Sequence, residues 1–238
     1  MVFQWKNLKL GFPASRRAPC VPQIQDAANR MKNTFYSPLL QTIASLPISS
    51  INSNRKVLLE EMAQYLREKL ITGQEIRLNF ICTHNSRRSQ FSQIWGQTAA
   101  AYYGIEVFCY SGGVEVTAFN PRAVAAIQRD GFKVVQKEGD NPIYFVLFSD
   151  DSEPIVAFSK VYDDTINATK DFAAVMTCDH ADENCPFIPG AEKRFPLRFE
   201  DPKAFDDSPQ EEQMYSERSR QIGAELFFLF ESLANPSA

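Results

Sequence analysis

A strand that runs directly into a turn and then a helix is the feature that most constrains this chain. Residues 76–81 (IRLNFI) are mostly apolar and predict a buried strand. Residues 82–89 follow at once, and the apolar positions from Phe91 to Ala101 have a helical spacing that ends at Gly104. The turn therefore lies where a strand ends and a helix begins.

A second unit of the same kind sets the fold class. We predict a strand over residues 106–110, and then a helix that Asn120 caps, Pro121 opens and Gly131 ends. Strands that alternate with helices are typical of parallel sheets covered by helices. We therefore expect an α/β fold, a three-layer sandwich around a parallel four-stranded core sheet.

Residues 139–164 interrupt the alternation. Two apolar runs, 143–148 and 155–158, flank a polar turn and predict a β-hairpin insertion, which we expect to extend one edge of the core sheet. The elements expected after it are a strand over 172–178, an acidic loop over 179–184, a short strand near 195–199 and a last helix opened by a capping box at 208–211.

The first 73 residues predict an N-terminal extension that is irregular at first and then helical. Apolar residues from Val57 to Leu70 have helical spacing, and Gly73 ends that helix. We therefore expect the extension to cover residues 1–73 and the main domain to cover residues 74–238.

Composition excludes several classes of partner and site. The net charge of −4 provides no basic field for nucleic acid, and no apolar run approaches the ~18 residues of a membrane span. Five cysteines, an odd number, without a secretory signal predict reduced thiols and a cytoplasmic protein. With two histidines and no closely spaced Cys/His pairs, we predict no metal site and no cofactor.

The turn carries the residues for anion chemistry. Backbone N–H groups at a helix start, together with the helix dipole, can hold a tetrahedral oxyanion, and Arg88 can grip two of its oxygens. The same positive field favours a thiolate nucleophile at Cys82, to which Ser89 can donate a hydrogen bond. Asn85 suits a left-handed turn inside the loop. The alternative is that Cys82 is a buried structural cysteine at a strand end.

Residues 82–90 (CTHNSRRSQ) resemble the signature loop of the low-molecular-weight phosphatase superfamily, and most of all its thioredoxin-coupled arsenate reductases. The resemblance covers residues 75–235 and implies that Cys82 and Arg88 are catalytic. It also implies that the remaining loop residues bind the substrate: Thr83, His84, Asn85, Ser86, Arg87 and Ser89. The family usually has Gly in place of His84 and often Cys in place of Arg87. Some of these reductases use a Glu for a potassium site; this chain has Gln93 there, and we predict no potassium.

Residues 177–186 (TCDHADENCP) also resemble the arsenate reductases, whose redox pair has the same spacing. Because the carboxyl ends of parallel strands share one edge, Cys178 should lie near the rim that holds Cys82. The resemblance implies that Cys178 attacks the Cys82–arsenate adduct and that arsenite leaves. Cys185 would then take over the disulfide and present it to a thioredoxin-like reductant. The alternative is a pair of structural cysteines.

Residues 199–202 (FEDP) resemble the Asp-Pro motif that supplies the general acid in this superfamily, which assigns that role to Asp201. In phosphotyrosine phosphatases aromatic residues often follow the motif, whereas Lys203 and Ala204 follow it here. This departure favours a reductase.

Three functions are therefore weighed, each with an arsenate or phosphate oxyanion as the ligand. The first is reduction of arsenate to arsenite by a cysteine nucleophile and a disulfide relay. The second is phosphomonoester hydrolysis by a low-molecular-weight protein tyrosine phosphatase through a phosphocysteine, which needs neither Cys178 nor Cys185. The third is an inactive oxyanion-binding or partner-docking module.

Overall fold

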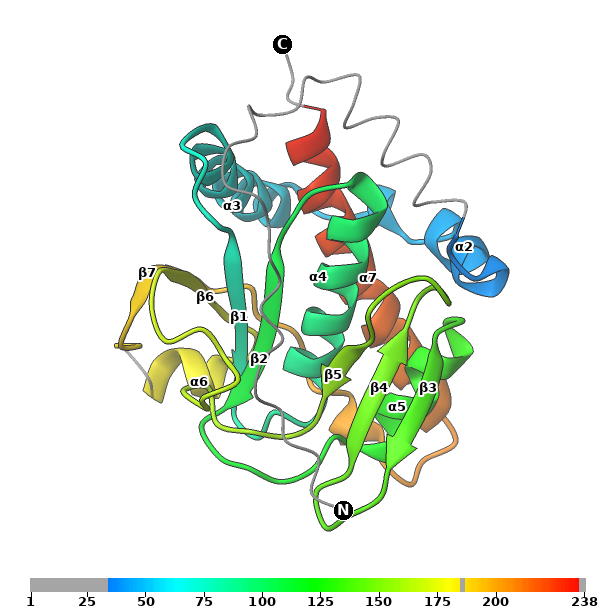
Figure 1. Cartoon of the computed structure of the whole chain (residues 1–238). Helices are drawn as coiled ribbons and strands as arrows, with labels where there is room; N and C mark the ends of the chain where they lie inside the picture. The colour runs from blue at the N-terminus through cyan, green and yellow to red at the C-terminus, as the bar shows by residue number, and fades with distance from the viewer. Residues whose placement is uncertain (1–33, 185–186, 236–238) are drawn as a thin grey trace.

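The core of the molecule is a four-stranded parallel sheet. The structure, a computed structural model, describes residues 34–184 and 187–235. The strands run in the order β2-β1-β6-β7, with bounds β1 Arg77–Cys82, β2 Phe108–Gly113, β6 Phe172–Met176 and β7 Ala191–Phe195. The predicted parallel α/β sheet is therefore confirmed (Figure 1).

The two faces of this sheet are covered by different elements, which gives three layers. Leu78, Phe80 and Val175 belong to a large core that α4 (Arg88–Tyr103) and α7 (Glu211–Ala234) complete. Ile81 and Met176 belong instead to a smaller apolar cluster, which α6 (Asp179–Asn184) covers through Ala181. Figure 1 shows α6 on one side of β1 and α4 with α7 on the other. Successive residues of β1 thus serve both layers, as the alternation of strand side chains requires.

The structure confirms the predicted end of one helix at Gly104 and the predicted start of another at Asn120. Gly104 ends α4 in the left-handed conformation with φ +67°, and α5 (Pro121–Arg129) begins at Asn120, whose side chain accepts a hydrogen bond of 2.9 Å from the Arg122 N–H. Glycine is favoured at a helix end because it adopts a positive φ without strain. Asparagine is favoured at a helix start because its side chain accepts a hydrogen bond from a backbone N–H that has no partner within the helix.

The helices of the N-terminal extension join the large core. They are α2 (Ser37–Ala44) and α3 (Ser53–Ile71), with a short 3-10 turn, η1 (Ile48–Ser50), between them. Leu39 from α2 and Leu66 from α3 are fully buried in the same cluster as the sheet residues. The domain boundaries at residues 73–74 and the insertion at 139–164 stay predictions, and the irregular start of the extension lies outside the described residues.

The inserted hairpin forms, but the prediction that it extends the core sheet is wrong. Strands β4 (Ile143–Leu147) and β5 (Ile155–Ala157) pair antiparallel, and β3 (Lys133–Lys137) pairs with β4, so a separate three-stranded sheet results. The sequence of β3, KVVQK, is largely polar and its residues are largely exposed, so the sequence did not predict this strand. β4 is paired on both edges, by β3 and by β5, and the insertion pairs with the core sheet only at the isolated bridge between Val161 and Gly113 among the described residues.

Three further details of the C-terminal part differ from expectation. The acidic loop at 179–184 is helix α6, because the Asp182 N–H donates to the Cys178 carbonyl and acidic residues favour a helix N-terminus. The fourth core strand is β7 at Ala191–Phe195 rather than near 195–199. The capping box does not form: the Ser208 hydroxyl donates to the Phe205 carbonyl at 2.7 Å, and α7 has no side-chain cap. A 3-10 turn, η2 (Pro202–Phe205), precedes α7.

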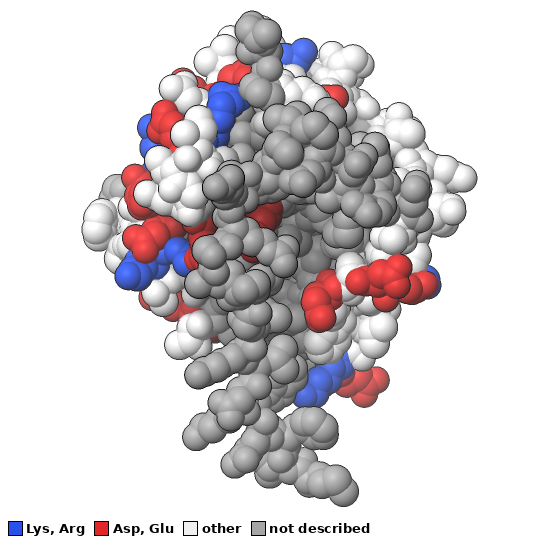
Figure 2. All heavy atoms as spheres, turned by 45° about the horizontal axis from the view of Figure 1, so that its top comes forward, with Lys and Arg blue, Asp and Glu red and all other residues white. Residues whose placement is uncertain are grey.

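The surface has mixed charge. On the face shown in Figure 2, basic and acidic side chains of the described residues lie interspersed rather than in blocks of one sign. Within the described residues, none of the helices has the length and apolar character of a membrane-spanning segment.

Candidate active site

Cys82 is the last residue of β1, and residues 83–87 carry the chain to the first residue of α4, Arg88. The Cys82 thiol is buried and lies in a network centred on its sulfur. The Asn85 N–H donates to Cys82 Sγ at 3.2 Å, and Ser89 Oγ lies 3.0 Å from the same sulfur. Both contacts can stabilise a thiolate, and the roles of Cys82 as nucleophile and Ser89 as its hydroxyl partner stay predictions.

Asn85 braces the loop from inside. Its backbone is left-handed, with φ +46°, as the sequence predicted. Its side-chain NH2 donates to Ser89 Oγ at 2.8 Å, and its Oδ1 accepts the backbone N–H of Lys160 at 3.0 Å. The loop is therefore tied both to the helix that follows it and to the segment after β5.

Arg88 and Asp201 meet at the mouth of the loop. Arg88 Nη2 lies 2.7 Å from Asp201 Oδ2, and Arg88 Nη1 donates to the Phe199 carbonyl at 3.1 Å. Arg87 Nη1 approaches the same carboxylate oxygen at 3.6 Å. These side chains line a small hollow together with Cys82, His84 and Ser86. An oxyanion there would face two guanidinium groups, a thiol and a carboxyl group.

The second arginine of the loop is held by a buried tyrosine. The Tyr215 hydroxyl accepts from Arg87 Nε at 3.1 Å and donates to Asp206 at 2.7 Å. Burial and the hydrogen bond to Asp206 raise the pKa of Tyr215, so its hydroxyl remains neutral. Arg87, which departs from the family pattern, is thus a built-in part of the site rather than a free surface charge.

The remaining predicted loop residues lie at the rim. The Ser86 hydroxyl donates to the Ala118 carbonyl at 2.7 Å. The half-exposed His84 ring points toward Glu115, with Nε2 3.4 Å from a carboxylate oxygen. Thr83 Oγ1 lies 3.5 Å from Cys178 Sγ and 3.4 Å from the His180 ring.

Cys178 lies where the sequence placed it, beside the loop. Its neighbour Thr177 donates its N–H to the Ile81 carbonyl at 2.7 Å, which joins the ends of β6 and β1. The Cys178 side chain is buried in the same apolar cluster as Cys82. Both are free thiols, as is Cys109 in β2. Cys185 lies outside the described residues.

Helix α6, which follows Cys178, is anchored by two arginines. Arg194 and Arg198 both bind the Asp182 carboxylate, and Arg198 Nη1 lies 3.0 Å from Asp179. These pairs hold Cys178 and the acidic segment against the sheet.

Three residues of this site carried no sequence signal or only a weak one. Lys160 touches Asn85 from the insertion, and its one hint is that it is a lone charge within the otherwise largely apolar residues 155–162. Tyr215 belongs to the helical spacing of α7 and gave no hint of its contact with Arg87. Gly113 lies so close to the loop that an added Cβ would be 2.8 Å from the Asn85 nitrogen.

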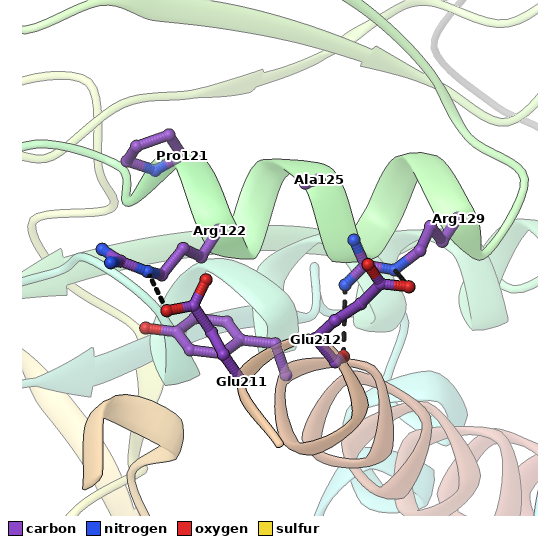
Figure 3. A pocket seen from close by; sticks show the side chains of 7 residues that line it. Pro121, Arg122, Ala125, Arg129, Glu211 and Glu212 are labelled. Atoms are coloured by element: carbon purple, nitrogen blue, oxygen red, sulfur yellow. Dashed lines mark hydrogen bonds and ion pairs between the residues drawn. The ribbon is translucent and has the colours of Figure 1, made fainter. Parts of the chain in front are cut away.

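A second hollow lies between α5 and α7, and its charges are already paired. It is lined by Pro121, Arg122, Ala125, Arg129, Glu211, Glu212 and Tyr215. Figure 3 shows Arg122 beside Glu211 and Arg129 beside Glu212. Arg122 Nε lies 2.7 Å from Glu211, and Arg129 Nε lies 3.7 Å from Glu212. Tyr215, which lines this hollow, also contacts Arg87 of the loop.

Known proteins with similar sequences are enzymes whose named substrate, arsenate, fits the oxyanion loop described above. No family model matches the chain. It is 31% identical over 123 residues to arsenate reductase 2 of Staphylococcus epidermidis, which covers 52% of this chain and 76% of that protein. It is 30% identical over 148 residues to arsenate reductase of Bacillus subtilis, which covers 62% of this chain and 89% of that protein.

Among solved structures, a low-molecular-weight phosphotyrosine phosphatase from Vibrio cholerae superposes with a TM-score of 0.47 at 14% identity, covering 68% of this chain and 99% of that one. Family membership rests on the sequence relatives. Their identity and coverage confirm the resemblance predicted from the loop. The chain therefore belongs to the family of these arsenate reductases.

Proposed function

We propose that this protein reduces arsenate to arsenite by a relay of three cysteines, Cys82, Cys178 and Cys185. The observation that carries the proposal is the placement of Cys178. Its thiol is buried against Thr83, the residue after Cys82, and both cysteines share one apolar cluster. The arsenate reductases among the relatives support the same activity. Phosphomonoester hydrolysis through a phosphocysteine needs one nucleophilic thiol and does not require Cys178.

The first step forms a covalent adduct. The Cys82 thiolate attacks arsenic(V), a sulfur–arsenic bond forms, and one arsenate oxygen leaves as water. Arg88, with the N–H groups of the loop, holds the remaining oxygens, and Thr83, His84, Asn85, Ser86, Arg87 and Ser89 shape the binding site. Asp201 supplies the proton to the leaving oxygen, for which it exchanges its contact with Arg88 for one with substrate.

The second step transfers two electrons. The Cys178 thiolate attacks Cys82 Sγ, a disulfide forms, and the electron pair of the broken sulfur–arsenic bond stays on arsenic, which leaves as arsenite. Cys185 then attacks Cys178 and releases the Cys82 thiolate. A thioredoxin-like reductant in the cytoplasm reduces the Cys178–Cys185 disulfide. Residues 179–184, which form α6, separate the two cysteines in sequence, and we expect this segment to rearrange during the exchange.

Thioredoxin-coupled turnover tests the proposal. We expect the wild-type protein to oxidise reduced thioredoxin when arsenate is present. Cys82→Ser and Cys178→Ser should each lower the rate of this oxidation by at least about a thousandfold. Cys109→Ser is the matched control, because Cys109 is also buried and burial raises its thiol pKa. Arsenate turnover by Cys178→Ser at the wild-type rate would contradict the proposed disulfide relay.

A second activity, phosphomonoester hydrolysis, is favoured by one contact. Asp201 lies 2.7 Å from Arg88 at the mouth of the Cys82 loop, so a carboxyl group that can protonate a leaving oxygen is placed beside the nucleophile without any need for Cys178. Aryl phosphate hydrolysis that survives Cys178→Ser, in a protein without arsenate turnover, would make this the main activity.

A further inference from the structure

Lys160 is a buried lysine whose backbone is fixed to the active loop. It follows β5 and is 3% exposed. Its N–H donates to Asn85 Oδ1 at 3.0 Å, and its carbonyl accepts the Gly113 N–H at 2.8 Å. The insertion and the carboxyl end of β2 therefore hold Lys160 immediately behind the loop that contains Cys82.

The acceptors that the described residues offer to the Lys160 ammonium group are uncharged, and the hydrogen bonds to them are long. Its Nζ lies 3.4 Å from Ser111 Oγ and 3.5 Å from the Phe158 carbonyl, and 4.8 Å from the centre of the Phe158 ring. Ser111 in turn donates to Gln93 Oε1 at 2.6 Å, which leaves its oxygen free to face the lysine. Within residues 34–184 and 187–235, Lys160 forms no ion pair with a carboxylate.

A buried charge without a counter-ion is costly, so its surroundings favour the neutral amine. Burial lowers the pKa of Lys160 to about 8, and the charge of Asp164 opposes the shift. The other groups that face the side chain are uncharged: Ser111 on β2, Gln93 on α4 and the Phe158 carbonyl and ring. An anion placed in the loop would supply the missing opposite charge.

We propose that Lys160 is a positioning residue for the oxyanion and the Cys82 thiolate, acting through the loop from behind. Its positive charge favours negative charge on the other side of the loop, and its backbone N–H orients Asn85, which contacts Ser89 and Cys82. The inserted sheet thereby contributes to oxyanion affinity. This inference rests on the proposed function, because it takes the loop as an oxyanion site.

The sign of the pH dependence follows from the lysine. Below its pKa the ammonium is present and favours the anion; as the pH rises through about 8 the charge is lost and anion binding weakens. The Cys82 thiol lies in the same network, so the test uses a variant that lacks it.

Sulfate binding to Cys82→Ser provides the test, because sulfate does not change charge near neutral pH. We expect calorimetry to show that adding Lys160→Met weakens sulfate binding roughly tenfold at pH 7 and removes the loss of affinity above pH ~8. Lys160→Arg keeps the charge, so affinity should persist to higher pH than in the parent. Lys170→Met, at an exposed lysine, is the matched control and should leave binding unchanged.

The outcomes separate the two proposals. Equal sulfate affinity of Lys160→Met and the parent at pH 7 overturns the role of Lys160 and leaves the oxyanion site intact. Absence of sulfate binding in the parent itself overturns both. If Lys160→Met does not fold, Lys160→Arg decides the question, because an unchanged pH profile in that variant contradicts the proposal.

Discussion

Replacement of Asn85 by alanine should destabilise the protein strongly, because this one side chain closes the loop in three ways. Its NH2 binds Ser89 Oγ, its Oδ1 binds the Lys160 N–H, and it tolerates the left-handed backbone at φ +46°. Two lost hydrogen bonds cost about 1 kcal/mol each, and the buried Lys160 N–H without a partner adds about 1 kcal/mol. A left-handed alanine adds about 1 kcal/mol more. We therefore expect Asn85→Ala to lower the free energy of unfolding by about 4 kcal/mol.

Asn85→Gly separates these contributions. Glycine loses the same hydrogen bonds but adopts a positive φ without strain, so its unfolding free energy should lie about 1 kcal/mol above that of Asn85→Ala. Urea unfolding, followed by the fluorescence of the buried Trp95, measures both values. Asn120→Ala is a control, because it removes only the cap on the Arg122 N–H and should cost about 1 kcal/mol. The reasoning is refuted if Asn85→Gly and Asn85→Ala are both within about 1 kcal/mol of wild type.

Two other substitutions test contacts around the site. Gly113→Ala would place a Cβ 2.5 Å from the Glu115 carbonyl oxygen and 2.8 Å from the Asn85 nitrogen, so we expect a loss of about 1–3 kcal/mol in thermal unfolding and weaker sulfate binding; a variant as stable as wild type would contradict this close approach. Arg55→Met removes the partner 2.7 Å from the buried Glu225, and should cost about 3 kcal/mol in urea unfolding at pH 7. Burial raises the pKa of Glu225 and Arg55 lowers it, so without Arg55 the carboxyl group protonates at higher pH and the penalty should shrink as the pH falls toward 5; an equal penalty at both pH values would rule this out.

The parts of the fold that sequence predicted are those fixed by neighbours along the chain. The apolar run before Cys82 predicted β1, and Asn120 with Pro121 predicted α5, because strand burial and helix capping depend on a few adjacent residues. The loop followed for the same reason: a strand end, a left-handed Asn85 and a helix start are local properties. The family resemblance added the role of Asp201, which the structure brings together with Arg88.

The parts that sequence missed depend on partners far along the chain. Strand β3 is polar on its own, and only pairing with β4 makes it a strand. The sequence predicts a loop in place of helix α6, because Arg194 and Arg198, which pair with its acidic side chains, come from the following segment. Lys160 and Tyr215 reach the active loop across 75 and 128 positions of sequence. No local pattern specifies such a contact.

The placement of α7 has a consequence for how the protein becomes active during its synthesis. Tyr215, Phe227 and Phe230 of this helix are fully buried in the large core, against elements translated much earlier. Until α7 leaves the ribosome, α4 lacks its main packing partner and Arg87 lacks its tyrosine. Because long-range contacts of this kind form late, the hollow beside Cys82 should acquire its fixed Arg87 only after translation has passed α7. A nascent chain would then carry the loop without the tyrosine that holds Arg87, and the complete hollow would appear with the finished fold.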